Sequence, residues 1–290
     1  MTSIKTWTSL VKFSHTIFAL PFALVGFGLA YLSFPSNFNW WLLIYMLLCM
    51  IFARNAAMAF NRYIDRHFDL LNERTKNREL PSKIIKPKNV LFFIIANIFL
   101  FIITSYQINH LAFFLSPVAL FVILFYSYSK RFTSLCHFIL GASLAIAPIG
   151  AYIVLSNKFD IVPLFLSGAV LFWVAGFDIL YSLQDEDFDK NNNLKSIPQR
   201  FGRKNALIIS SISHIFSIIF LFSIIFVIKT SWFYIIGLSI FSIILIWEHL
   251  IVKPSDISRI NTAFATMNAI ASIIFAVFAL VDMFGFYIFS

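Results

Sequence analysis

Residues 208–228 read IISSISHIFSIIFLFSIIFVI and contain no Asp, Glu, Lys or Arg. Roughly 17 to 25 predominantly apolar residues are enough for an α-helix to cross the hydrocarbon core of a bilayer. The rest of the chain agrees: of its 290 residues, 60% are hydrophobic and only 12% are charged, and the mean hydropathy is +0.86. Because ordinary globular domains lie far from these values, the sequence predicts an integral membrane protein.

The other apolar stretches predict the architecture. They are apolar on most faces and lack the alternating segments of about ten residues that build membrane β-barrels. We therefore expect an all-α, polytopic fold of about nine transmembrane helices, long enough to span the bilayer and forming a single domain over residues 1–290. The expected spans are residues 14–33, 40–62, 89–107, 111–128, 136–156, 161–182, 206–228, 232–252 and 264–286.

Basic residues fall on alternate connections between these spans. All Lys and Arg except Arg54, Lys158 and Lys229 lie in the N-terminal segment, at the last residue of the second expected helix or after every second expected helix. By the positive-inside rule, this asymmetry predicts a cytoplasmic N-terminus for a multi-pass protein of the cell membrane. The net charge of +9 is then explained by topology, and no nucleic-acid partner is expected.

The first acidic motif follows the second expected span. Asn61, Asp65 and Asp69 are spaced by four residues and so share one face of a helix, together with Arg54. Carboxylate and amide oxygens suit Mg²⁺, which keeps open positions for substrate phosphate oxygens. The spacing therefore predicts a magnesium site for a phosphate-bearing substrate. The alternative is a solvated helix end whose acids pair with neighbouring arginines.

The second acidic motif lies at the end of the sixth expected span. Asp178, Asp185 and Asp189 are expected on one helical face, with Glu186 and Asp187 turned to solvent. Both motifs lie at the ends of even-numbered spans, so we expect them on the same side of the membrane, facing one cavity at its cytoplasmic edge. There, bound metal ions would neutralise the charge on a diphosphate leaving group.

Basic and aromatic side chains near these motifs are the candidate substrate contacts, because diphosphate oxygens need N–H and O–H donors. Tyr126 and Lys130 are four residues apart and share a helix face, and Arg131 follows directly. The residues expected to bind substrate are Arg54, Arg66, Tyr126, Lys130, Arg131, Tyr181 and Lys195.

Arg54 differs from the others because it lies inside a span. A guanidinium there usually faces a polar cavity, where it would hold a carboxylate or phenolate of an acceptor; pairing with Asp178 is the alternative. His15 and His137 are interpreted as lone histidines that satisfy backbone carbonyls, and neither is assigned to the site.

The combined motifs resemble those of the UbiA superfamily of intramembrane aromatic prenyltransferases. They are Lys12-Phe-Ser-His-Thr-Ile-Phe-Ala-Leu-Pro21-Phe, Asn61-Arg-Tyr-Ile-Asp65-x-x-x-Asp69, Arg74-Thr-x-x-Arg78-x-Leu-Pro81, Tyr126-Ser-Tyr-Ser-Lys130-Arg131-Phe-Thr, Gly176-Phe-Asp178-Ile-Leu-Tyr181-Ser-Leu-Gln-Asp185-x-x-x-Asp189 and Lys195-Ser-Ile-Pro. The resemblance implies nine helices around a central cavity, with Mg²⁺ bridging the acidic motifs to a polyprenyl diphosphate. It assigns metal and diphosphate binding to Asn61, Asp65, Asp69, Asp178, Asp185 and Asp189, and diphosphate contacts to Arg66, Tyr126 and Lys130.

Within the superfamily, the motifs are most similar to those of 4-hydroxybenzoate polyprenyltransferases and of the related enzyme in the futalosine route to menaquinone. The resemblance therefore implies prenylation of an aromatic acid, either 4-hydroxybenzoate or a dihydroxynaphthoate-type acceptor, with Asp65, Asp69, Asp178 and Asp185 as the catalytic carboxylates. Two alternatives stay open. One is prenylation of a tetrapyrrole, and the other is a membrane transporter, for which ionisable residues near the bilayer midplane are typical.

Overall fold

The computed structural model describes residues 4–11 and 18–289. Over this part of the chain the regular structure is helical, apart from one isolated bridge between Lys253 and Asp256. Eight of the described helices are long and apolar enough to cross a membrane. The all-α, polytopic prediction is therefore confirmed. The α-helices are α1 (Ile4–Leu10), α2 (Leu20–Ser33), α3 (Trp40–Leu71), α4 (Pro87–Ile108), α5 (His110–Ser129), α6 (Cys136–Ser156), α7 (Ile161–Ser182), α8 (Glu186–Asn191), α9 (Ile197–Ser223), α10 (Trp232–Ile251) and α11 (Asn268–Phe289).

Three helices differ from the expected spans. The first expected span, 14–33, is described only as the shorter helix α2, because residues 14–17, His15 among them, lie outside the described residues. Helix α3 continues through the first acidic motif to Leu71 instead of ending at residue 62. Helix α9 begins at Ile197 rather than near residue 206, since the Ser196 hydroxyl accepts the backbone N–H of Gln199 and caps it there.

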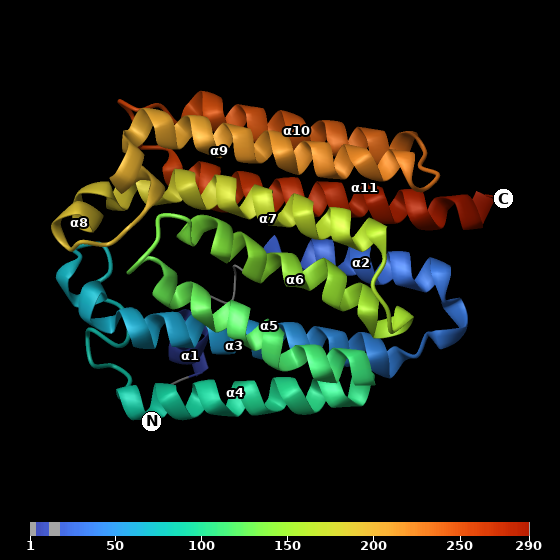
Figure 1. The fold of residues 1–290 in the computed structure, drawn as a ribbon, viewed down its shortest axis with the longest axis horizontal. Coiled ribbons are helices and arrows are strands. Elements are labelled where there is room, and N and C mark those ends of the chain that lie inside the picture. The colour runs from blue at the N-terminus through green and yellow to red at the C-terminus, as the bar shows by residue number, and fades with distance from the viewer. Residues whose placement is uncertain (1–3, 12–17, 290) are drawn as a thin grey trace. The chain divides into compact units, whose positions relative to one another are not determined.

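The chain divides into two compact units. The first comprises residues 1–16 and 39–129, and in it α3 packs against both α4 and α5 (Figure 1). The Asn39 side chain caps α3 by accepting the N–H of Trp41 at 3.0 Å. This unit carries the first acidic motif.

The second unit comprises residues 17–38 and 130–290. Helix α7 packs between α6 and α9, while α2 packs on α6 and α11, and α10 on α11 (Figure 1). Its interior is aromatic: Phe22, Trp173, Phe241 and Phe275 are fully buried against one another. The rigid packing of α6, α7 and α9 fixes the helix ends that carry the second acidic motif.

Two interruptions of regular helix lie in this second unit. Gly202, with φ 75° and ψ 166°, breaks α9 near its start. A π-helical turn, Thr262–Met267, precedes α11, and π turns inside helices frequently accompany functional sites. Asn268 closes this turn, donating to the carbonyl of Ala263 and accepting the indole N–H of Trp173.

Candidate active site

The first acidic motif lies on the continuous helix α3, so its four-residue spacing does place Asn61, Asp65 and Asp69 along one face. The amide Nδ2 of Asn61 donates to Oδ2 of Asp65 at 3.1 Å, and both side chains are half-buried. This pair presents one amide oxygen and one carboxylate together, which is the kind of donor set that Mg²⁺ takes from proteins.

Asp69 is held at the C-terminal end of α3. Its Oδ1 lies 2.7 Å from Nη1 of Arg78, and its backbone carbonyl accepts the hydroxyl of Thr75 at 3.0 Å. Oδ2 is buried and has no hydrogen-bond partner among the described residues. Because a buried carboxylate oxygen is costly without a partner, this atom is suited to a bound cation or water.

The two arginines of this unit that were assigned to substrate bind backbone carbonyls. Arg66 donates to the carbonyl of Tyr63 at 2.6 Å and lies over that ring, 4.6 Å from its centroid. Nη2 of Arg54 lies 3.4 Å from the carbonyl of Val11. A guanidinium has five N–H donors, so Arg66 keeps donors beyond the one that binds Tyr63.

The second acidic motif is not one continuous α-helix. Helix α7 ends at Ser182, the chain tightens to a 3-10 turn over Leu183–Asp185, and α8 begins at Glu186. The expectation that one continuous α-helix carries Asp178, Asp185 and Asp189 is therefore wrong. A 3-10 turn has three residues per turn instead of 3.6, which changes the direction of the side chains that follow it.

Asp178 lies in the last turns of α7 and pairs with His137 at the start of α6. Oδ2 of Asp178 is 2.7 Å from Nδ1 of His137. The histidine side chain is 2% exposed and the carboxylate 20% exposed. On its other edge, Nε2 of His137 accepts the backbone N–H of Ile197 at 3.3 Å. The interpretation of His137 as a lone histidine outside the site is thus wrong.

Asp189 is fully buried beside Lys130. Its Oδ1 lies 2.7 Å from Nζ of Lys130, and its Oδ2 accepts the Ser196 hydroxyl at 2.8 Å. Burial favours the neutral amine of Lys130, but the Asp189 carboxylate outweighs this and, with a smaller contribution from Asp185, raises the pKa of Lys130. Three charged residues of the predicted site therefore lie within electrostatic reach of one another.

The expectation that Glu186 faces solvent is also wrong. Instead of facing solvent it is buried, and its two oxygens bind Nζ of Lys190 at 2.9 Å and Nε of Arg203 at 2.8 Å. Asp187, its neighbour, is exposed as expected. The acidic run after α7 therefore contains a structural carboxylate that joins α8 to α9, in addition to the candidate functional ones.

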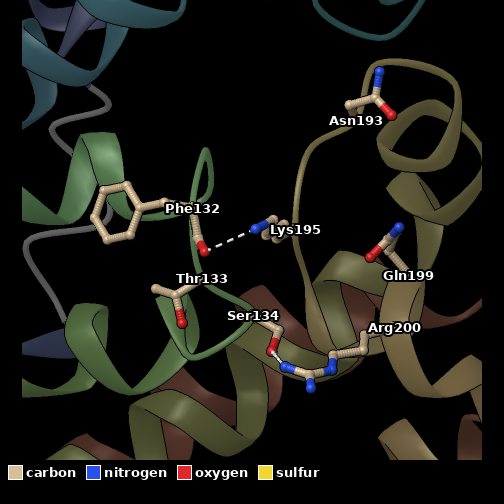
Figure 2. A pocket seen from close by; sticks show the side chains of 7 residues that line it. All are labelled: Phe132, Thr133, Ser134, Asn193, Lys195, Gln199 and Arg200. Atoms are coloured by element: carbon tan, nitrogen blue, oxygen red, sulfur yellow. Dashed lines mark hydrogen bonds between the residues drawn. The ribbon is translucent and has the colours of Figure 1, made fainter.

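Lys195 lies beside Lys130, whose backbone carbonyl accepts the Lys195 N–H at 2.7 Å. It belongs to a pocket of ≈ 430 Å³ between the α5–α6 connection and the start of α9, shown in Figure 2. In that view Nζ of Lys195 reaches the carbonyl of Phe132 at 3.1 Å, while Arg200 points to the hydroxyl of Ser134 at 3.4 Å. No acidic residue lines this pocket.

The remaining candidate contacts are divided between the units. Tyr126 lies in the last turn of α5 in the first unit, whereas Lys130 and the exposed Arg131 begin the second. Tyr181 stacks on Phe264 of the π turn, with ring centroids 4.1 Å apart. Its ring is therefore fixed, one turn along α7 from Asp178.

Across the described residues, no group of three or more His, Cys, Asp or Glu side chains is placed to hold a metal ion by itself. Mg²⁺ usually takes only one or two protein carboxylates and completes its coordination with water and substrate phosphate. Taken separately, the Asn61–Asp65 pair and the unpartnered oxygen of Asp69 in the first unit, and the partly exposed carboxylate of Asp178 in the second unit, each fit that mode. The residues present are therefore compatible with Mg²⁺ bound together with a diphosphate.

Sequence reasoning missed the partners of these acids. His137, Arg78 and Ser196 hold Asp178, Asp69 and Asp189, respectively. A usable signal existed only for His137: a carboxylate inside an apolar span needs an explicit partner, and a histidine at the start of a neighbouring span is a suitable one.

Known proteins similar in sequence match most of this chain. A model of the UbiA prenyltransferase family matches residues 19–287. The 4-hydroxybenzoate octaprenyltransferase of Vesicomyosocius okutanii subsp. Calyptogena okutanii (strain HA) is 28% identical over 81% of this chain and 85% of its own length. The protein of the same name from Aliivibrio salmonicida (strain LFI1238) is 33% identical, over 59% of this chain and 60% of its own.

Solved structures give the same result for the fold. The apo structure of a UbiA homolog from Aeropyrum pernix K1 superposes with a TM-score of 0.83 at 29% identity, covering 93% of this chain and 98% of that one. A UbiA homolog from Archaeoglobus fulgidus, solved bound to DMAPP and Mg²⁺, superposes with a TM-score of 0.66 at 20% identity, covering 94% and 99%. At that identity, the second likeness concerns the fold alone.

Proposed function

Because this chain belongs to the UbiA prenyltransferase family and is a prenyltransferase, we propose that it transfers a polyprenyl group from a polyprenyl diphosphate to an aromatic acid in a Mg²⁺-dependent reaction. The acceptor is 4-hydroxybenzoate or a dihydroxynaphthoate-type acid of quinone biosynthesis. The observation that carries this choice is the likeness to a 4-hydroxybenzoate octaprenyltransferase over 81% of the chain. The family assignment removes the transporter alternative, while a tetrapyrrole acceptor remains a second candidate.

In the proposed reaction the C–O bond between the allylic carbon and the diphosphate breaks, and its electron pair leaves with the diphosphate. A ring carbon of the acceptor attacks the resulting carbocation, and the ring then loses a proton. When bound, Mg²⁺ neutralises charge on the departing diphosphate. We propose that Asn61, Asp65 and Asp69 of the first unit and Asp178 and Asp185 of the second would supply the oxygen atoms that hold Mg²⁺.

Basic side chains supply the hydrogen bonds to the diphosphate oxygens. Lys130 has three N–H donors, one of which faces Asp189, so the others are left for the substrate. We assign Asp189 to orienting Lys130, because its oxygens are already bound by Lys130 and Ser196. Arg66, Tyr126, Arg131 and Lys195 are the further proposed diphosphate contacts, while Arg54 is proposed to hold the carboxylate or phenolate of the acceptor and Tyr181 to contact the substrate.

The apolar helices serve the same reaction. A carbocation reacts readily with water, so its lifetime depends on water being excluded from the site. A site at the end of membrane-spanning helices provides this, and it lets a long isoprenoid tail remain in lipid. We propose a cytoplasmic location for the site, supported by the basic residues on the connections that carry the two motifs.

The test uses membranes that contain the full chain, a polyprenyl diphosphate of defined length, 4-hydroxybenzoate and Mg²⁺, with the product identified by mass. Asp65→Asn and Asp178→Asn should each lower the rate by about 100-fold or more, since each removes charge opposite the leaving group. Asp187→Asn is the matched control, because Asp187 is exposed. Full activity of either first variant, or of the wild type in excess EDTA, would overturn the proposal.

A further inference from the structure

His137 occupies a position that suits it to control Asp178. It is the second residue of α6, it is almost completely buried, and both of its ring nitrogens have partners on other helices. Nδ1 lies 2.7 Å from Oδ2 of Asp178 on α7, and Nε2 lies 3.3 Å from the backbone nitrogen of Ile197 on α9. The imidazole ring therefore joins the ends of three helices.

The partners determine which nitrogen carries the proton. The backbone N–H of Ile197 donates, so Nε2 must offer a lone pair, and in a neutral imidazole the proton then resides on Nδ1. This tautomer is inferred from the hydrogen-bond pattern. Nδ1–H consequently points at Asp178 and makes a hydrogen bond to a carboxylate, which is stronger than one between neutral groups.

The Ile197 N–H lies at the N-terminus of α9, which explains why it is available to His137. It belongs to the first turn of α9, where backbone N–H groups have no partner within the helix. The preceding residue, Ser196, donates its hydroxyl to Asp189. The start of α9 thus contacts His137 through Ile197 and Asp189 through the preceding Ser196, so the orientation of the imidazole is tied to the same segment that binds the other buried acid.

We propose that His137 is a positioning residue for the transfer reaction: its Nδ1–H holds the Asp178 carboxylate in one orientation, while the Ile197 N–H holds the ring. The interaction leaves the second oxygen of Asp178 with no other hydrogen bond or ion pair among the described residues and keeps the carboxylate 20% exposed. A fixed carboxylate with one open oxygen binds a cationic ligand without first losing rotamer freedom. This role rests on the function proposed above for Asp178.

Two isosteric variants separate the two hydrogen bonds. In His137→Asn the amide nitrogen takes the place of Nδ1 and keeps the donor to Asp178, but nothing reaches Ile197. In His137→Gln the amide oxygen takes the place of Nε2 and keeps the bond to Ile197, but the donor to Asp178 is lost. If His137 acts through Asp178, the Gln variant should lose about 10- to 100-fold in activity and the Asn variant should retain most of it.

Two measurements distinguish positioning from a merely structural role. The first is the rise in melting temperature of the purified protein on adding Mg²⁺ and inorganic diphosphate, which reports binding without turnover. It should shrink in His137→Gln but not in His137→Asn. The second is a double-variant cycle: in an Asp178→Asn background, His137→Gln should cause little further loss of activity.

The outcomes are separable from those of the proposed function. Equal losses in the Asn and Gln variants, or an unchanged melting shift in the Gln variant, would show that His137 only supports packing, and the positioning role would be rejected. Additive losses in the cycle would reject it as well. A fully active Asp178→Asn protein would instead overturn the function proposed for Asp178 itself.

Discussion

Lys130 and Asp189 form an ion pair of 2.7 Å in which the carboxylate is completely buried and the lysine side chain remains 33% exposed. Breaking such a pair from the lysine side leaves an uncompensated charge in the interior. We expect Lys130→Met to lower the free energy of unfolding by about 2 to 3 kcal/mol, measured by thermal unfolding in detergent or nanodiscs. Lys130→Met combined with Asp189→Asn should recover most of the loss, because the amide oxygen still accepts from Ser196.

The same pair predicts a pH dependence. Since the folded-state pKa of Lys130 is raised, its contribution to stability is fully present below the unfolded lysine pKa of about 10.4 and is lost as the pH rises through the folded value. The difference in melting temperature between wild type and Lys130→Met should therefore persist up to about pH 9 and narrow above about pH 10.4. A difference that already narrows at pH 7 would contradict this assignment.

Glu186 and Asp185 are neighbours with opposite expected behaviour. Glu186 is buried between Lys190 and Arg203, so Glu186→Gln should cost about 1 to 3 kcal/mol of stability and leave the activity per folded molecule nearly unchanged. Asp185→Asn should do the reverse, because Asp185 is half-buried and assigned to the diphosphate. Unfolding curves and turnover measured on the same preparations check both. Loss of turnover in Glu186→Gln at unchanged stability would speak against this division.

Two glycines provide a matched pair for helix packing. A Cβ at Gly176 would lie 2.2 Å from Cδ2 of His214, whose ring is held by His249 at 3.0 Å and is not free to turn away. Gly176→Ala should therefore destabilise the protein by about 1 to 3 kcal/mol through overpacking of α7 against α9. Gly150→Ala meets nothing within 4 Å and should be neutral or stabilising by up to about 1 kcal/mol. Equal effects of the two substitutions on the melting temperature would contradict this reading.

We expect Arg78 to stabilise the first unit more than the nearby Arg74 does. Nη1 of the Arg78 guanidinium lies 2.7 Å from Oδ1 of the buried Asp69. Arg78→Met should lower the stability by about 1 to 3 kcal/mol and weaken the diphosphate-dependent melting shift, because Asp69 loses its partner. Arg74→Met is the control, since Arg74 is exposed. Equal unfolding midpoints for these two variants would show that the Asp69 pair contributes little.

The sequence predicted the parts of this structure that depend on local properties. Charge-free stretches marked the spans, and the four-residue spacing of Asn61 and Asp65 placed them together because α3 is continuous. The prediction for the second motif was wrong at Leu183–Asp185, where the chain forms a 3-10 turn. The spacing of the acidic residues does not indicate such a turn. The pairing of His137 with Asp178 joins residues 41 positions apart and depends on how α6 packs on α7. Likewise, the four-residue spacing from Tyr126 marked Lys130 rather than Arg131, but it did not show that Lys130 pairs with Asp189.

Gly202 carries a practical consequence. Its backbone, at φ 75° and ψ 166°, adopts a conformation open almost exclusively to glycine, although no atom lies within 4 Å of where a Cβ would stand. The break lets the first turn of α9 keep Ser196 and Ile197 against Asp189 and His137 while the rest of the helix follows its own axis. Mutant libraries that aim to change the acceptor should therefore keep Gly202. Any other residue there would strain the backbone, and such variants would be lost through misfolding whatever their effect on the acceptor.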